Sequence, residues 1–196
     1  MAKKINKDLV EPIDSKKYLY KEMDVGLNVE DSLLYLVGPL EDYSSYDFIT
    51  KCRTILKFRE SKDGGPINVL INSPGGCMYE MFSIIDYMNQ LEVKINITCR
   101  GFAMSAAAMV LACATGKRSA SRHSTIMLHE GSAWNIGKNS DIQASAKHSL
   151  HMESMANNLL ESKTNKNAKW WKKNTRTDLF LSAKEALDFG IIDEIL

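Results

Sequence analysis

The sequence lacks several features that would place it quickly in a class of protein. Its 25 basic and 24 acidic residues nearly cancel, which argues against a dedicated nucleic-acid-binding protein. No apolar run approaches the ~20 residues of a membrane-spanning helix, and the polar N-terminus has no apolar core typical of a signal peptide. We therefore expect a cytoplasmic protein with neither a membrane nor a nucleic acid as its partner.

Cysteine pairs of the C-x-x-C type are also missing. The four cysteines (Cys52, Cys77, Cys99 and Cys113) are scattered and stand mostly among apolar residues, which favours buried free thiols in a reducing compartment over disulfides. A chain of 196 residues is long enough to bury a core as one domain without a stapling metal or disulfide. We expect no metal and no cofactor.

Apolar periodicity predicts an α/β fold, because segments with strand-like and helix-like spacing alternate. The strand-like segments are 33–37, 67–71, 93–98 and 124–129, and the helix-like segments are 44–58, 78–91, 104–114 and 182–190. Strands separated by helices should form a parallel sheet with right-handed crossovers. Residues 1–31 are polar and weakly periodic, so we expect an N-terminal arm ahead of a domain at 32–196.

The longest predicted helix, at about 140–162, is polar apart from one apolar stripe. The stripe consists of Ile142, Leu150, Met152, Met155 and Leu159. Two other helices carry start signals. Ser44 or Ser45 can cap the helix at 44–58, and Ser182 with Glu185 predicts a capping box at the last helix.

Ser105 is the first candidate for chemistry. It follows Gly101, which we expect to end a strand, and it precedes an alanine-rich helical segment. A serine in such a segment is often only a small packing residue. At a helix N-terminus, however, free backbone N–H groups favour a developing negative charge. Ser105 is then a candidate nucleophile, and the N–H group of Ala106 would face the substrate oxyanion.

Three other positions complete a candidate hydrolase site. Gly76, in the turn Asn72-Ser-Pro-Gly-Gly76, either relieves steric strain between a strand and a helix or donates a second oxyanion hydrogen bond. His129 ends an apolar strand and is either a structural residue or the base for Ser105. Asp178 is either a turn residue or the carboxylate that orients the imidazole.

Taken together, the motifs resemble the proteolytic subunit of the Clp protease family. The resemblance covers roughly residues 33–196 and rests on five segments in matching order. They are Ile71-Asn-Ser-Pro-Gly-Gly76, Gly101-Phe-Ala-Met-Ser105, Gly116-Lys-Arg118, Ile126-Met-Leu-His129 and the stretch from Phe180 to Glu194.

The resemblance implies an ATP-independent serine peptidase of crotonase-like fold, with stacked parallel sheets and a protruding handle helix at about 140–162. It implies Ser105 as nucleophile, His129 as base, Asp178 as orienting carboxylate, and Gly76 with Ala106 as oxyanion donors. It also implies a homo-oligomer of two stacked seven-membered rings. Such a barrel degrades peptides or unfolded chains, which an ATP-dependent unfoldase normally supplies.

The chain departs from the family pattern at several places. Ala106 replaces the usual methionine, Glu130-Gly131 replaces Gln-Pro, and the segment that forms the axial gate is not recognisable in residues 1–31. Arg176-Thr177 stands where the family has a charged pair that joins the two rings. Two other hypotheses remain: a catalytically silent ring subunit, and a crotonase-type acyl-CoA enzyme, whose chemistry generally relies on acidic residues instead of a Ser–His pair.

Overall fold

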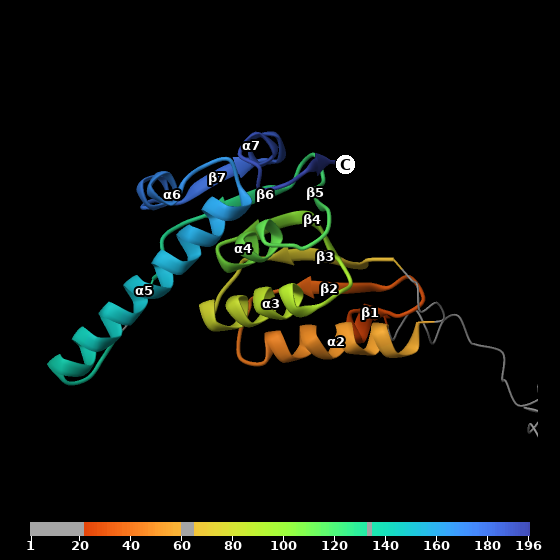
Figure 1. The fold of residues 1–196 in the computed structure, drawn as a ribbon, viewed down its shortest axis with the longest axis horizontal. Coiled ribbons are helices and arrows are strands. Elements are labelled where there is room, and N and C mark those ends of the chain that lie inside the picture. The colour runs from red at the N-terminus through yellow and green to blue at the C-terminus, as the bar shows by residue number, and fades with distance from the viewer. Residues whose placement is uncertain (1–21, 60–64, 133–134) are drawn as a thin grey trace, which may run out of the picture.

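The computed structural model describes residues 22–59, 65–132 and 135–196 (Figure 1). Eight strands in this part of the chain form one hydrogen-bonded sheet, and helices pack against it. The strands are β1 (Leu27–Asn28), β2 (Leu33–Val37), β3 (Ile67–Ser73), β4 (Ile95–Met104), β5 (Arg118–Ala120), β6 (Thr125–Leu128), β7 (Leu179–Ser182) and β8 (Glu194–Ile195). The helices are α2 (Ser44–Phe58), α3 (Met78–Gln90), α4 (Ala106–Ala112), α5 (Asn139–Lys163), α6 (Ala168–Asn174) and α7 (Ala183–Asp188). The predicted α/β class is confirmed.

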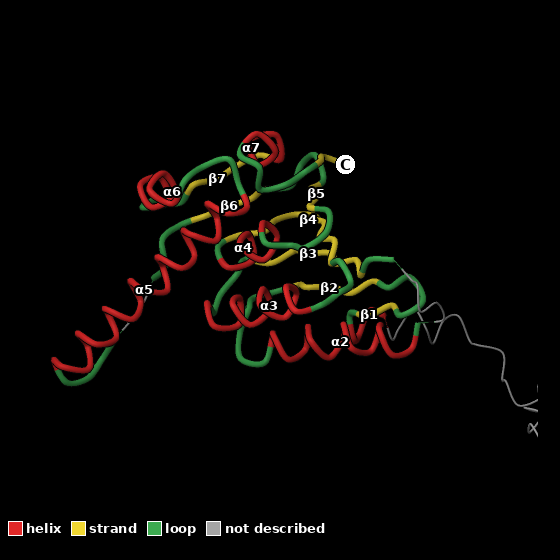
Figure 2. Tube along the Cα trace, viewed as in Figure 1, coloured by secondary structure: helices red, strands yellow, loops and turns green. Residues whose placement is uncertain are grey.

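The central part of the sheet is parallel, as predicted. Its main path runs β1-β2-β3-β4-β5-β8, and all neighbours from β2 to β8 along it are parallel. The sheet branches at β4, because the first half of β4 pairs with β5 and its second half with β6. Two pairings are antiparallel: β1 with β2, and β6 with β7. Figure 2 shows the strands running through the centre of the domain.

Gly101 lies inside β4, so the prediction that it ends the strand is wrong. Its φ of 94° lies in the region that favours glycine, and an added Cβ would stand 2.7 Å from the Asn72 side chain. The bend at Gly101 separates the half of β4 that pairs with β5 from the half that pairs with β6. The chain therefore stays extended to Met104, and α4 starts at Ala106.

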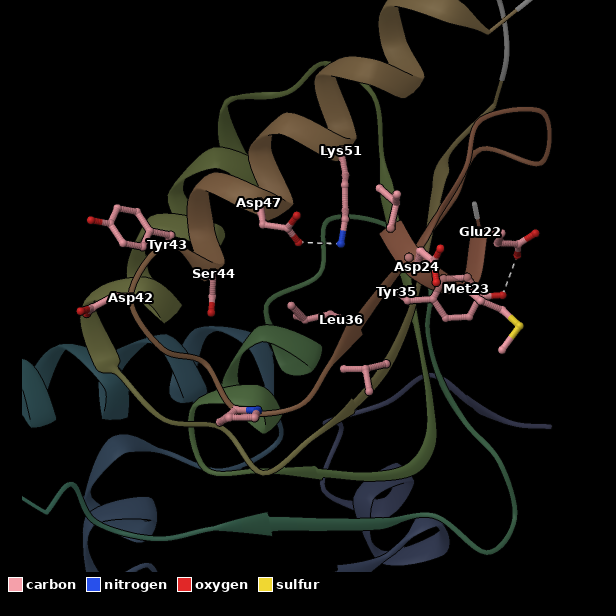
Figure 3. A pocket seen from close by; sticks show the side chains of 14 residues that line it. Glu22, Met23, Asp24, Tyr35, Leu36, Asp42, Tyr43, Ser44, Asp47 and Lys51 are labelled. Atoms are coloured by element: carbon pink, nitrogen blue, oxygen red, sulfur yellow. Dashed lines mark hydrogen bonds and ion pairs between the residues drawn. The ribbon is translucent and has the colours of Figure 1, made fainter. Parts of the chain in front are cut away.

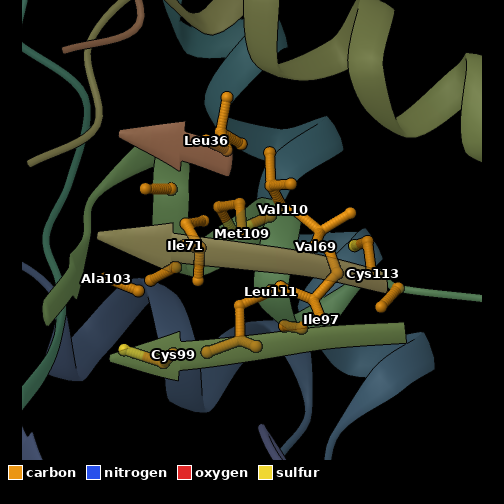
Figure 4. Close-up of a cluster of buried hydrophobic side chains, with 14 of the residues drawn as sticks. Leu36, Val69, Ile71, Ile97, Cys99, Ala103, Met109, Val110, Leu111 and Cys113 are labelled. Atoms are coloured by element: carbon orange, nitrogen blue, oxygen red, sulfur yellow. The ribbon is translucent and has the colours of Figure 1, made fainter. Parts of the chain in front are cut away.

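The core lies between the sheet and a layer of helices. All seven residues of α4 are buried, because α4 packs on β4 and is covered by α3 and α5. Figure 4 shows Met109, Val110 and Leu111 of α4 against side chains from β2, β3 and β4. The alanine-rich composition allows this close packing, since small side chains let the helix approach the strands.

Most other predicted helices and strands lie within a few residues of their predicted positions, and the capping box at Ser182 and Glu185 is present. The predicted cap of α2 is wrong. Tyr43 precedes α2 with a left-handed φ of 74°, and the Ser44 hydroxyl accepts a 2.9 Å hydrogen bond from the backbone N–H of Glu41. Five short elements had no clear periodic signal, namely β1, β5, β7, β8 and α6.

Helix α5 extends well beyond the rest of the domain (Figure 1). Its predicted apolar stripe does not act as one surface. Met152 is 8% exposed and Leu159 packs against the core, whereas Met155 and Leu150 are 42% and 62% exposed. The stripe therefore divides into residues that attach α5 to its own domain and residues that face outward. None of the described helices combines the length and the apolar character needed to cross a membrane.

The described fold begins ahead of residue 32. Residues 1–21 of the predicted arm lie outside the described residues, but β1 pairs with β2, and the Tyr35 hydroxyl donates a 2.9 Å hydrogen bond to Glu22. A hollow of about 820 Å³ adjoins this corner (Figure 3). The residues that line it include several acids and Lys51, whose Nζ atom lies 2.6 Å from the Asp47 Oδ2 atom.

Arg118 ties the C-terminal part of the chain to the sheet. Its guanidinium donates hydrogen bonds to the backbone carbonyl groups of Lys163 (2.9 Å) and Gly190 (2.8 Å), and it forms an ion pair with Asp193. Burial alone would raise the pKa of Asp193. Side-chain and backbone hydrogen bonds from Arg118 outweigh it, so the pKa lies below its usual value.

We predict that Arg118→Met lowers the free energy of unfolding by about 3 kcal/mol, because it leaves carbonyl groups and Asp193 without their donor. Lys117→Met, which removes the exposed pair with Glu194, is the control and should cost about 0–1 kcal/mol. The interaction with Arg118 lowers the pKa of Asp193. The contribution of this ion pair to the free energy of unfolding is therefore present at neutral pH and is lost as Asp193 protonates, below about pH 4. Urea unfolding of the wild type and both variants at pH 7 and at about pH 3 measures these effects. Equal losses of unfolding free energy for the two variants at pH 7 would contradict the prediction.

Candidate active site

Ser105 sits in a strained turn between β4 and α4. Its φ of 53° and ψ of −124° are unusual for a residue with a side chain. The strain is held by long-range contacts: the backbone N–H of Ser105 donates to the Met127 carbonyl at 2.7 Å, and the last residues of β4 pair with β6. A strained strand-to-helix turn is the geometry that exposes a nucleophilic serine in other hydrolases.

His129 contacts Ser105 directly. Its Nε2 atom lies 2.7 Å from the Ser105 hydroxyl oxygen, within hydrogen-bonding range. This contact follows from the sheet, since Met104 of β4 pairs with Met127 of β6 and both chains then continue past the same edge. The residue after His129 is also held in place, because the backbone N–H of Glu130 donates a 2.6 Å hydrogen bond to the Thr175 carbonyl.

Asp178 lies on the other side of the imidazole. Antiparallel pairing of Leu128 in β6 with Leu179 in β7 brings the next residues of the two chains, His129 and Asp178, opposite each other. The His129 Nδ1 and Asp178 Oδ1 atoms are 3.5 Å apart, and the two side chains are 30% and 55% exposed. The distance exceeds that of a strong hydrogen bond, but a modest shift of the exposed carboxylate would close it.

The glycine turn packs against the same serine. A Cβ on Gly75 would stand 2.4 Å from the Met104 carbonyl oxygen and 2.9 Å from the Ser105 Cβ, so no side chain fits there. Gly76 has a φ of 145°, and its added Cβ would meet the Leu40 carbonyl oxygen at 2.3 Å. The backbone N–H of Leu40 donates a hydrogen bond to the Gly75 carbonyl, and the Leu40 carbonyl accepts one from the N–H of Cys77. The turn therefore holds the backbone of Gly76 close to Ser105.

Ala106 is the first residue of α4, where backbone N–H groups have no acceptor within the helix. Its nitrogen lies 2.7 Å from the Cβ that Gly75 would carry, so the two backbones are in contact. The structure thus places all five predicted site residues around Ser105. These residues are Gly76, Ser105, Ala106, His129 and Asp178.

A cavity of about 50 Å³ opens beside Ser105 between α4 and α5. Our sequence analysis did not assign its polar members on α5, Glu153 and Asn157, to the site. One signal was available: Asn157 stands three residues before Leu160 and four after Glu153, so the three share one side of the helix. A polar residue on the inward side of an amphipathic helix is a reason to look for a site.

The other histidines stay apart from this cavity. His123 and His151 are exposed. His148 is exposed as well, but its Nε2 atom lies 2.9 Å from the Tyr79 hydroxyl and the two rings stack. It therefore links α5 to α3.

The cysteines do not compete with Ser105 as nucleophiles. Cys52, Cys99 and Cys113 are buried free thiols, as predicted, and Cys77 is half-buried. Burial raises the pKa of Cys52 to about 12 and the pKa values of Cys99 and Cys113 to about 11. Because the thiolate is the reactive form, these three thiols are inert near neutral pH.

Comparison with known proteins shows which family the chain resembles. The sequence model of the Clp protease family matches residues 21–196. The ATP-dependent Clp protease proteolytic subunit 2 of Frankia casuarinae is 35% identical over 170 residues, which are 86% of this chain and 76% of the relative. Subunit 3 of the same organism is 34% identical over 170 residues, 86% of this chain and 78% of the relative.

The fold and the Ser105–His129 contact define a protein built like a serine hydrolase. Within that class, the chain belongs to the Clp protease family. Family membership supports a peptidase role of the Clp proteolytic type.

Proposed function

We propose that the protein is a serine endopeptidase with Ser105 as nucleophile, His129 as general base and Asp178 as the carboxylate that orients His129. The observation that carries the proposal is the 2.7 Å contact between His129 Nε2 and the Ser105 hydroxyl oxygen. The strain at Ser105 supports it, because an unfavourable φ is retained where a function requires it.

In the proposed reaction the Ser105 oxygen attacks the carbonyl carbon of a peptide bond while His129 Nε2 takes the hydroxyl proton. The N–H groups of Gly76 and Ala106 stabilise the oxyanion, and each such donor is worth ~10²–10³ in rate. His129 then passes the proton to the leaving amine, which leaves an acyl group on Ser105. His129 next takes a proton from water as the water oxygen attacks the acyl carbon. It then returns that proton to the Ser105 oxygen as the acid is released.

We further propose that the protein assembles with copies of itself into two stacked seven-membered rings in the cytoplasm, cuts peptides or unfolded chains, and receives them from an ATP-dependent unfoldase. The names of the two Frankia relatives, which contain the words ATP-dependent Clp protease, support a link to an ATP-dependent unfoldase. The exposed Leu150 and Met155 on α5 support an interface. The sheet supports it too, because Asn68 and Asn96 lie on a half-exposed face, whereas parallel sheets are normally covered on both faces.

A fluorophosphonate probe tests the catalytic proposal. We expect one probe per chain, attached to Ser105, together with cleavage of short peptides without ATP. Mass spectrometry of the labelled protein locates the probe. An unlabelled Ser105 in an assembled particle would favour the silent-subunit hypothesis, and turnover of acyl-CoA thioesters without peptide cleavage would favour a crotonase-type enzyme.

A further inference from the structure

Basic residues are concentrated in one short part of the chain, around α6. Residues 162–177 contain six of the 25 basic residues and none of the 24 acidic residues. The remainder of the chain is therefore net acidic, with 24 acidic residues against 19 basic ones. Such a separation of charge gives one surface a positive potential, which the nearly neutral total of the chain conceals.

Four of these basic residues are exposed and have no counter-ion. They are Lys169, Lys172, Lys173 and Arg176, and we call them the basic surface of α6. None of the four forms an ion pair within the part of the chain that the structure describes. The three lysines share one side of the helix, because they are three and four residues apart, and like charges at that spacing repel. An anionic partner would relieve this repulsion.

The helix that carries the basic surface is firmly attached to the domain. Trp171 is fully buried, and its Nε1 atom donates a 2.9 Å hydrogen bond to the Thr164 hydroxyl. The ring of Trp170 meets the rings of Trp171 and Phe189 edge to face, with centroids 5.0 and 5.3 Å apart. The charged side chains therefore extend from a rigid support, so a partner that binds them does not have to order the backbone.

The basic surface begins at the edge of the candidate active site. Arg176 stands two residues before Asp178, and the carbonyl group of Thr175 accepts the hydrogen bond from Glu130, the residue after His129. Figure 1 shows α6 next to β7, the strand that follows Asp178. The seven residues of α6 span about 10 Å, which three extended residues of a bound chain would cover.

We propose that the basic surface of α6 binds acidic stretches of polypeptide substrates and holds them while a neighbouring neutral segment is cleaved at Ser105. The inference rests on the proposed peptidase function. Next to Ser105 the charges are opposite, because Glu130 and Glu153 line the cavity there. An acidic side chain at the cleaved bond would therefore be repelled, and the favoured position of the acidic stretch is about three or more residues away.

An acidic peptide fits this surface better than a nucleic acid does. Proteins that bind single-stranded nucleic acids without regard to sequence combine basic residues with exposed aromatic rings on which the bases stack. Both aromatic residues of α6 are used internally. Trp171 is buried, and the half-buried Trp170 has the Nζ atom of Lys166 5.3 Å from its ring centroid. Carboxylates, in contrast, need only the ammonium and guanidinium groups that α6 displays.

Three fluorogenic peptides test the proposal. They share one neutral segment that is cleaved and differ in a tail of four aspartates, four asparagines or four lysines. The tail starts three residues from the cleaved bond and is placed on either side in turn. For the wild type at low salt we expect kcat/KM for the aspartate tail about tenfold above the asparagine tail on at least one side, with the lysine tail lowest. At 0.5 M salt the ratio should approach one.

Two double variants show whether α6 causes this preference. Lys172→Gln with Lys173→Gln should lower the aspartate-to-asparagine ratio to about threefold or less. Lys57→Gln with Lys94→Gln removes the same charge from exposed lysines at the end of α2 and before β4, and should keep the ratio. The ratio does not depend on how much of a variant is folded or assembled.

Binding is measured separately from cleavage, by fluorescence anisotropy of the same peptides with the Ser105→Ala protein. The aspartate-tailed peptide should bind more tightly than the asparagine-tailed one. Equal binding, a wild-type cleavage ratio near one, or equal effects of the two double variants would each overturn the proposal and leave the peptidase function standing. Tighter binding of a single-stranded oligonucleotide than of the aspartate-tailed peptide would overturn it in favour of a nucleic acid. Failure to cut any peptide, with no fluorophosphonate label on Ser105, would overturn the proposed function and this inference together.

Discussion

Replacing Ser105 with alanine should reduce peptide hydrolysis by about 10⁴- to 10⁶-fold, because the serine and histidine of such sites act as a unit. The change removes one oxygen atom, the one that lies 2.7 Å from His129 Nε2. Alanine at this position also keeps the Cβ that already packs against the glycine turn. The fold and the assembly should therefore remain as in the wild type.

The measurement is kcat/KM on a short peptide, with the assembly state checked by size-exclusion chromatography on the same sample. Ser154→Ala is the matched control, since Ser154 is an exposed serine on α5. It should keep wild-type activity. An assembled Ser105→Ala protein that retains more than about a tenth of the activity would exclude Ser105 as the nucleophile.

Replacing Met155 with glutamate should separate the proposed double ring and stop catalysis. Met155 is 42% exposed on α5. If this surface is the joint between rings, a glutamate there buries a charge without a partner, and ring symmetry repeats that penalty in every subunit. Met152, which our sequence analysis placed in the same stripe, is buried in its own domain and is not part of this surface.

Analytical ultracentrifugation and peptide hydrolysis measure both consequences. Met23→Glu makes the same chemical change at a 78% exposed methionine beside the hollow of Figure 3, away from α5, and should leave the particle intact. Arg176→Ala should weaken the joint only modestly, since exposed ion pairs contribute about 0–1 kcal/mol each. Dissociation by Arg176→Ala but not by Met155→Glu would show that charge, and not the apolar surface, holds the rings together.

Local spacing was enough to predict much of this protein. Apolar periodicity located β2 and α2 at the residues where the structure has them, because a buried strand and an amphipathic helix each repeat with their own period. The capping box at Ser182 is equally local, since its two partners are three residues apart. Ser105, His129 and Gly76 were recognisable because each follows or ends a segment whose type is clear.

Contacts between distant segments could not be read from spacing. Asp178 meets His129 because β6 pairs antiparallel with β7, a strand that gave no periodic signal. No side chain fits at Gly75 because the carbonyl group of Met104, at the end of β4, stands where its Cβ would be. Asn157 and Met155 are neighbours on one helix, yet one lines the cavity and the other faces outward. Periodicity assigns residues to the faces of an element, but only packing sets which face meets the core, the cavity or solvent.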